Sequence, residues 1–161
     1  MPAAIHHSLE TLFRELIEGA EADACSMLNK KDPGLLRSLE RLSASAASAV
    51  PSSGGASIAA HVDHLRYGLS LMNRWSRGEA NPWATADWTA SWRRTTVNDA
   101  EWATLRGELS REGRAWLQAL RTPHDYSPME LTGAIASIAH LAYHLGAIRQ
   151  IDRSIRGPAT D

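Results

Sequence analysis

Residues 131–155, LTGAIASIAHLAYHLGAIRQIDRSI, decide the fold class of this chain. Their large apolar residues recur at intervals of three or four, which is the period of one face of an α-helix. The predicted inner face consists of Ile135, Ile138, Leu141, Leu145 and Ile148. Gly157 and Pro158 then end the pattern. The stretch therefore predicts a long amphipathic helix over about residues 131–155.

Three further segments carry the same helical period. The first covers about residues 8–29, and the second begins at Ser57, a residue type that caps helices. The third begins at Asn98, which with Glu101 has the spacing of a capping box. Val is scarce in the chain whereas Ala and Leu dominate, and this balance favours helices over strands. The sequence therefore predicts an all-α protein with four long helices.

The segment between the second and third predicted helices is unusually long. Over residues 77–97 the helical period fades, and Gly, Pro and several Trp residues appear. Neighbouring helices usually need only 2–8 connecting residues. A crossover along the length of the molecule explains the extra chain and leaves its two flanking helices parallel. Because 161 residues suit one domain, we expect a single four-helix bundle over residues 1–161 with a long crossover between helices 2 and 3.

Composition excludes several classes of function. The formal net charge is −1, whereas a nucleic-acid-binding domain is normally basic, so we expect no nucleic-acid partner. The apolar stretches are shorter than the roughly 20 residues that span a bilayer, and we expect neither a membrane span nor a signal peptide. Cys25 is the one cysteine, which excludes an internal disulfide. We expect a cytoplasmic protein in which Cys25 packs in the first helix as a small buried apolar residue.

Four of the seven histidines form two pairs on predicted helices. His140 and His144 are about 40° apart around a helix, and His61 and His64 about 60° apart. Each pair borders the apolar stripe of its own helix, so the two pairs can converge on one ion. Imidazole suits zinc, nickel, copper or iron, although buried imidazoles without a metal remain an alternative. The other three histidines are expected at the surface: His6, His7 and His124.

A family resemblance follows from these motifs. The stretch Ser57–Tyr67, with its His64-Leu65 pair, and the stretch Ile138–Ile151, with its His-x-x-x-His, are similar to the DinB family, also called DinB/YfiT-like. The resemblance implies a divalent transition metal, zinc or nickel, on His64, His140 and His144. It leaves His61 as a partner of a ligand, an alternative ligand or a buried imidazole. Ala147 departs from the family, in which many members carry Gln at this position.

The resemblance also implies a class of activity. The family includes bacillithiol transferases and a mycothiol-dependent maleylpyruvate isomerase, and a divalent ion can stabilise the thiolate of a low-molecular-weight thiol. We therefore expect a thiol-dependent transferase that acts on a small-molecule substrate, and a homodimer. A metal-dependent hydrolase is the nearest alternative, and a non-enzymatic module that dimerises through exposed helix faces is another. The sequence identifies no catalytic side chain beyond the metal ligands.

Overall fold

A computed structural model describes residues 2–21, 25–52 and 54–159. These residues form α-helices and short 3₁₀ turns without a strand, which confirms the all-α prediction. The elements in chain order are α1 Pro2–Glu18, α2 Gly34–Glu40, α3 Ala44–Ser48, α4 Ile58–Ser76, η1 Ala90–Trp92, α5 Asp99–Arg121, α6 Pro128–Ile151 and η2 Arg153–Ile155.

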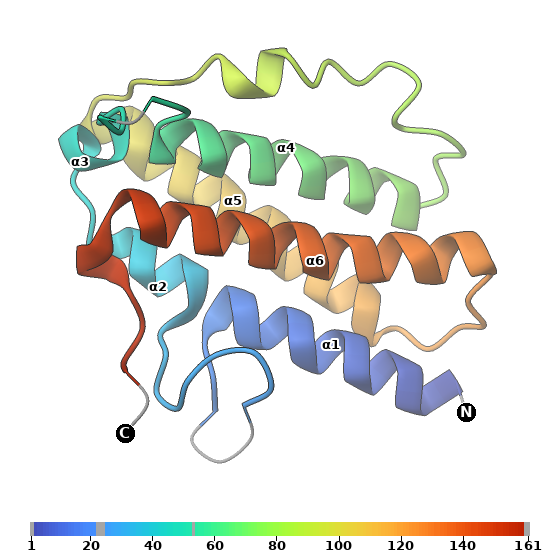
Figure 1. Cartoon of the computed structure of the whole chain (residues 1–161). Helices are drawn as coiled ribbons and strands as arrows, with labels where there is room; N and C mark the ends of the chain where they lie inside the picture. Colours follow the sequence, from blue (N-terminus) through green and yellow to red (C-terminus); the bar gives the residue numbers. More distant parts are fainter. Residues whose placement is uncertain (1, 22–24, 53, 160–161) are drawn as a thin grey trace.

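The long helices α1, α4, α5 and α6 pack around one core. Helix α4 contacts α5 and α6, and α1 contacts the same two helices from the other side. Figure 1 shows α4 and α5 running in one direction, and α1 and α6 in the opposite direction. Residues 77–98 return above α4 toward its first turn, where α5 begins. The largest fully buried side chains come from all four helices and from α2, and include Phe13, Leu35, Leu71, Leu105 and Leu141.

Helix starts follow the expected capping chemistry. The Ser57 hydroxyl accepts from the Ala60 N–H at the start of α4, and Asn98 forms the predicted capping box with Glu101. A second capping box, between Ser127 and Glu130, starts α6 earlier than predicted. Each capping side chain satisfies a backbone N–H that has no partner within the helix.

The first predicted helix is too long, because α1 ends at Glu18. Gly19 follows with φ +114°, and a Cβ there would lie 2.5 Å from the Asp32 carbonyl oxygen, so only glycine fits this turn. The Glu15 carboxylate then accepts three consecutive N–H groups of residues 26–28. Cys25 lies next to this loop and is exposed, so the prediction of a buried helical cysteine is wrong.

Helix α6 differs from its prediction at both ends and on one face. It ends at Ile151, because Asp152 leaves helical geometry and caps η2. Ile135 is 53% exposed, so its place on the inner face is wrong. By length and composition α6 could cross a membrane. The sequence did not predict such a span, because its uninterrupted apolar stretches are short. The core helix of a water-soluble protein passes the same test, and α6 packs on both α1 and α4.

Candidate metal centre

Helices α4 and α6 bring three imidazoles to one point. The Nε2 atom of His140 lies 3.1 Å from His64 Nε2 and 2.9 Å from His144 Nε2. The candidate ligand atoms of the three side chains all lie within 4.8 Å of one another. His64 and His144 are buried and His140 is half-buried. The structure thus brings together the three histidines that the family resemblance implies as metal ligands, and we call them the His cluster.

The geometry of the His cluster fits a small divalent cation. Tetrahedral ligands at zinc–nitrogen distances of 2.0–2.1 Å are about 3.4 Å apart, close to the separations seen here. Without a cation the three nitrogens satisfy one another poorly, because one proton on His140 Nε2 serves only one of its two neighbours. A cation accepts all three lone pairs at once. Three imidazole ligands also leave a fourth coordination position free for another molecule.

A serine in the 77–98 segment fixes the proton position on His64. The Ser91 hydroxyl donates to the Trp88 carbonyl at 2.7 Å. Its oxygen is therefore available only as an acceptor for His64 Nδ1, which lies 2.8 Å away. His64 thus carries its proton on Nδ1 and presents the Nε2 lone pair to the cluster. Such partners of the ligands commonly orient metal-binding histidines.

His61 plays the equivalent part for His144. Its Nδ1 atom lies 2.8 Å from His144 Nδ1 in a buried contact between α4 and α6. When His144 Nε2 offers a lone pair, its Nδ1–H donates to His61. Of the three roles left open for His61, the structure places it as a hydrogen-bond partner of a candidate ligand.

Burial keeps the cluster uncharged at neutral pH. Desolvation is the main cause that lowers the pKa of His64 to about 4 and that of His144 to about 3, and mutual repulsion between the imidazoles adds to it. Burial also lowers the pKa values of His61 and His140. Neutral imidazoles have the free lone pair that metal binding requires.

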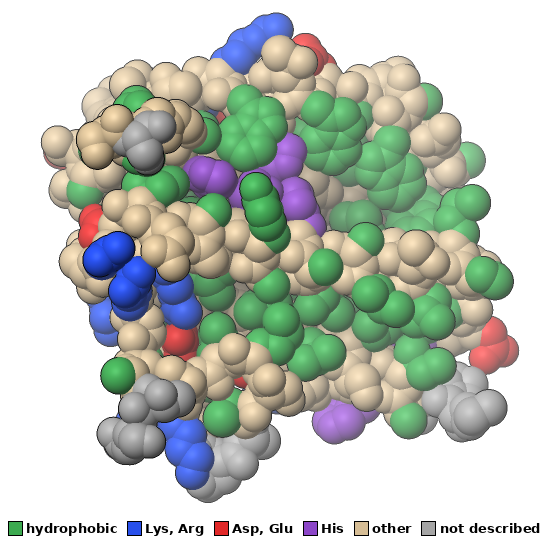
Figure 2. Space-filling view, in the orientation of Figure 1, with side chains coloured by type: hydrophobic (Ala, Val, Ile, Leu, Met, Phe, Trp, Pro, Cys, Tyr) green, Lys and Arg blue, Asp and Glu red, His purple; other side chains and the backbone are tan. Residues whose placement is uncertain are grey.

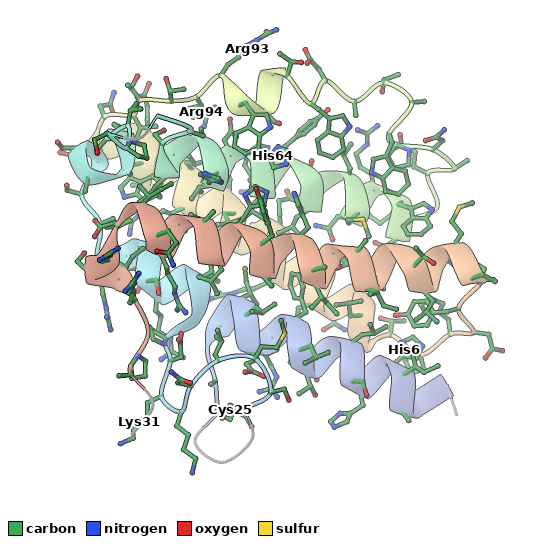
Figure 3. All side chains as sticks on the ribbon, viewed as in Figure 1. His6, Cys25, Lys31, His64, Arg93 and Arg94 are labelled. Atoms are coloured by element: carbon green, nitrogen blue, oxygen red, sulfur yellow. The ribbon has the colours of Figure 1, made fainter. Side chains whose placement is uncertain are left out.

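The cluster opens on one face of the molecule between aromatic side chains. Figure 2 shows histidine surface surrounded by hydrophobic side chains, and Figure 3 shows His64 beneath the η1 turn. Trp92 of η1 stacks on the His64 ring at 4.3 Å, and Trp88 lies 5.6 Å from the same ring. Cys25 lies on the opposite side of the molecule (Figure 3), so its thiol does not belong to this site.

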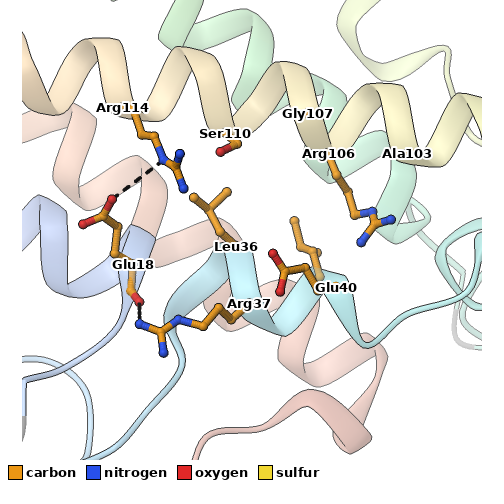
Figure 4. A pocket seen from close by; sticks show the side chains of 10 residues that line it. Glu18, Leu36, Arg37, Glu40, Ala103, Arg106, Gly107, Ser110 and Arg114 are labelled. Carbon is orange, nitrogen blue, oxygen red and sulfur yellow. Dashed lines mark hydrogen bonds and ion pairs between the residues drawn. The ribbon is translucent and has the colours of Figure 1, made fainter.

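A cavity of about 430 Å³ begins at the His cluster and extends between α4, α6 and the 77–98 segment. His64 and His140 are part of its wall, and most of the other lining side chains are apolar. A larger cavity of about 550 Å³ lies elsewhere, between α2 and α5 (Figure 4). It contains no histidine, and its lining carries charges of both signs, such as Glu18, Arg37 and Arg114. The smaller cavity is therefore the one that borders the candidate metal ligands.

The carboxylate nearest to His64 in sequence, that of Asp63, forms ion pairs and is not part of the His cluster. Asp63 is buried, and its two oxygens pair with Arg66 Nε at 2.8 Å and Arg94 Nε at 3.5 Å. Among the described residues, the His cluster is the one group of three or more His, Cys, Asp or Glu side chains arranged for a metal.

One histidine expected at the surface is buried instead. His6 is 4% exposed, its Nδ1 lies 3.0 Å from the Leu120 carbonyl, and the His124 N–H donates to its Nε2. It joins α1 to the last turn of α5 and to the chain that follows, whereas His7 and His124 are exposed as predicted.

Sequence reasoning missed Ser91 in the 77–98 segment. For the Trp residues of this segment it favoured packing on the bundle, with a place in a substrate pocket as the alternative for Trp92. Ser91, Trp88 and Trp92 lie where the helical period is absent, so no spacing connects them to the histidines. The cluster of Trp residues in that segment was a signal that it packs on the bundle, but it did not say on which helix face.

A family model described as the DinB superfamily matches residues 32–148, a range that includes all three histidines of the cluster. No curated protein and no solved structure matches the chain.

Proposed function

The chain belongs to the DinB superfamily, and on this premise we propose that it is a metal-dependent transferase that uses a low-molecular-weight thiol. In this proposal α1, α4, α5 and α6 form a four-helix bundle with residues 77–98 as its crossover. The bound ion is zinc or nickel, because imidazole nitrogens are suitable ligands for both metals.

The observation that carries the proposal is the convergence of three Nε2 atoms at the wall of an apolar cavity. His64, His140 and His144 would hold the ion. When bound, the ion would supply the positive charge that lowers the pKa of a thiol and keeps it as the nucleophilic thiolate. Ser91 and His61 would hold the protons of His64 and His144 on Nδ1, so that both ligands keep their Nε2 lone pairs.

The surroundings favour a thiol over water as the nucleophile. Water activation by a zinc enzyme commonly uses a neighbouring carboxylate as general base. Among the described residues, no Asp or Glu lines the 430 Å³ cavity, and Asp63 is occupied by two arginines. A thiol needs less assistance, because its ordinary pKa of about 8.5 already lies near neutral pH.

We also propose that the protein acts in the cytoplasm as a homodimer. Thiols of low molecular weight are kept reduced there. Met129, Ile135 and Tyr143 on α6 are 74%, 53% and 70% exposed, and such apolar side chains support a contact between two copies.

The first test measures metal content. Untagged protein is purified without chelators, equilibrated with zinc or nickel and dialysed. Its metal content is then measured by inductively coupled plasma mass spectrometry. We expect one metal ion per chain, and none in His64→Ala, His140→Ala or His144→Ala, with helicity by circular dichroism retained. His124→Ala is the matched control and should keep one ion, because His124 lies outside the cluster.

The second test measures consumption of the thiol group. The metal-loaded protein is mixed with a small thiol and an aromatic electrophile, and the free thiol is followed over time. We expect consumption that requires the metal and is lost in His144→Ala. Metal-dependent ester hydrolysis without thiol consumption would instead support the hydrolase, and an absence of stoichiometric metal would contradict both enzymatic functions.

A further inference from the structure

We infer that the cavity beside the His cluster receives a neutral, largely aromatic small molecule as the second substrate of this protein. Calling this molecule a substrate rests on the proposed function, but the predicted binding does not require catalysis. It follows from the position, charge, ring chemistry and size of the cavity.

The position of the cavity puts its occupant next to the proposed ligands. His64 and His140 form one end of the cavity, and the rest of the wall comes from α4, α6 and the 77–98 segment. A molecule that fills the cavity therefore meets the imidazole rings at one end only. Its reactive atom would lie at that end, and the remainder of the molecule would contact apolar surface.

Among the residues that the structure describes, no Asp, Glu, Lys or Arg side chain lines the cavity. Ser137 is its one hydroxyl group, and this group is already engaged, because it accepts from Trp116 Nε1 at 2.9 Å and donates to the Ala134 carbonyl at 2.7 Å. An unpaired charge in such surroundings would lose its hydration without gaining a partner. The occupant is therefore uncharged over the part that enters the cavity.

Two indoles from the 77–98 segment give the cavity its preference for flat rings. Trp88 lies edge-on to Tyr67, with ring centroids 5.6 Å apart, and the Tyr67 hydroxyl accepts from the Asp87 N–H. Trp83 lies edge-on to Trp75 at 5.1 Å. These contacts hold both indoles in place, and aromatic rings gain extra attraction when they stack on or meet such faces edge-on.

The size of the cavity indicates more than one ring. Its volume of about 430 Å³ is roughly three times that of a 150 Å³ cavity known to hold benzene. Gly68 forms part of the wall, where an added Cβ would lie 3.6 Å from His140 and 4.0 Å from Trp88, both ordinary contacts. A longer side chain at Gly68 would instead extend into the space that the ligand needs.

The test uses two fluorescent probes that differ in charge. N-phenyl-1-naphthylamine is neutral, and 8-anilino-1-naphthalenesulfonate has the same ring systems with an added sulfonate. Each is titrated into the zinc-equilibrated protein and into the chelator-treated protein. We expect one neutral probe per chain. In the chelator-treated protein it should bind at least about tenfold more tightly than the anionic probe, because only the anionic one brings a charge into a cavity that then holds no cation.

Matched glycine variants locate the binding. Gly68→Leu should weaken the neutral probe at least about tenfold by filling the cavity, while the metal content stays at one ion per chain. Gly107→Leu makes the same change on α5, in the wall of the charged 550 Å³ cavity, and should bind the probe as the wild type does. If Gly68→Leu loses helicity, Trp88→Leu is used in its place. This variant should weaken binding of the neutral probe although the cavity wall remains apolar.

Each outcome decides one question. Equal affinity of the chelator-treated protein for the two probes, or equal loss in Gly68→Leu and Gly107→Leu, would overturn the inference. Metal binding without binding of the neutral probe would overturn it while leaving the proposed metal centre intact. Binding of the neutral probe that depends on Gly68, in a protein that takes up no metal, would support the inference and contradict the proposed function.

Discussion

Acidification of the metal-free protein from pH 7 to pH 5 should remove much of its stability through the His cluster. Histidines in the unfolded chain have a pKa near 6.5 and become charged over this interval. In the folded protein, burial is the main cause that lowers the pKa of His64 to about 4 and the pKa of His144 to about 3. The unfolded state therefore binds more protons than the folded state below pH 6.5, and the free energy of unfolding falls as the pH falls.

The magnitude follows from the separation of these pKa values. Each pH unit below 6.5 costs about 1.4 kcal/mol for each histidine that stays neutral only in the folded state. Over the 1.5 units down to pH 5, His64 and His144 together account for about 4 kcal/mol. The lowered pKa values of His61 and His140 act in the same direction. Because domains of this kind are stable by only about 5–15 kcal/mol, the change is large.

Urea unfolding followed by circular dichroism, with a chelator present, measures this loss at pH 7.0, 6.0 and 5.0. His144→Gln removes one titrating imidazole, so the pH-dependent loss should shrink by about 2 kcal/mol. The control is His7→Gln, which replaces an exposed histidine outside the cluster and should lose as much stability as the wild type does.

Two results would refute the reasoning. One is a wild-type protein whose unfolding free energy does not change between pH 7.0 and 5.0. The other is a His144→Gln variant that loses as much stability on acidification as the His7→Gln control. Either result would mean that the buried imidazoles do not resist protonation in the folded state.

Three further predictions address the ligand partner, a buried ion pair and the dimer. Ser91→Ala removes the acceptor for His64 Nδ1–H and should weaken zinc affinity about 10–100-fold in competition with a chromophoric chelator; unchanged affinity would contradict the orienting role. Arg149→Met leaves the buried Asp32 carboxylate without the cation that both its oxygens contact, and should lower the urea-derived stability by about 3–5 kcal/mol. A loss below about 1 kcal/mol would show that Asp32 finds another partner. Light scattering should give twice the monomer mass for the wild type and the monomer mass for Ile135→Lys, and the dimer proposal fails if the wild type is monomeric.

The helical class and the two pairs of histidines were predictable from the sequence because both depend on local periodicity. His140 and His144 lie one turn apart on α6, and the His61 and His64 pair borders the stripe of α4, so helical spacing placed the two pairs at facing positions. The choice of His64 rather than His61 as a ligand came from the family resemblance. The capping box at Asn98 was also visible, because all its contacts fall within four residues.

Features that depend on packing between distant segments were not predictable in the same way. His6 is buried by residues that lie more than 110 positions away in the sequence, and no local pattern predicts such a contact. Cys25 lies beyond the end of α1, where the backbone at Gly19 closely approaches Asp32. The spacing of apolar residues does not predict this approach. Ile135 continues the apolar stripe of α6 at a place where no other helix covers it.

Two kinds of scaffold meet at the His cluster, and they have different freedom to change. The nitrogens come from two long helices, whose spacing is fixed by the core, whereas Trp83, Trp88 and Ser91 come from a segment whose regular structure is limited to the short turn η1. Exchanging the indoles of that segment could therefore give new ligand selectivity while the imidazoles stay in position. For protein engineering, residues 77–98 are thus the natural region to randomise, provided that Ser91 is kept.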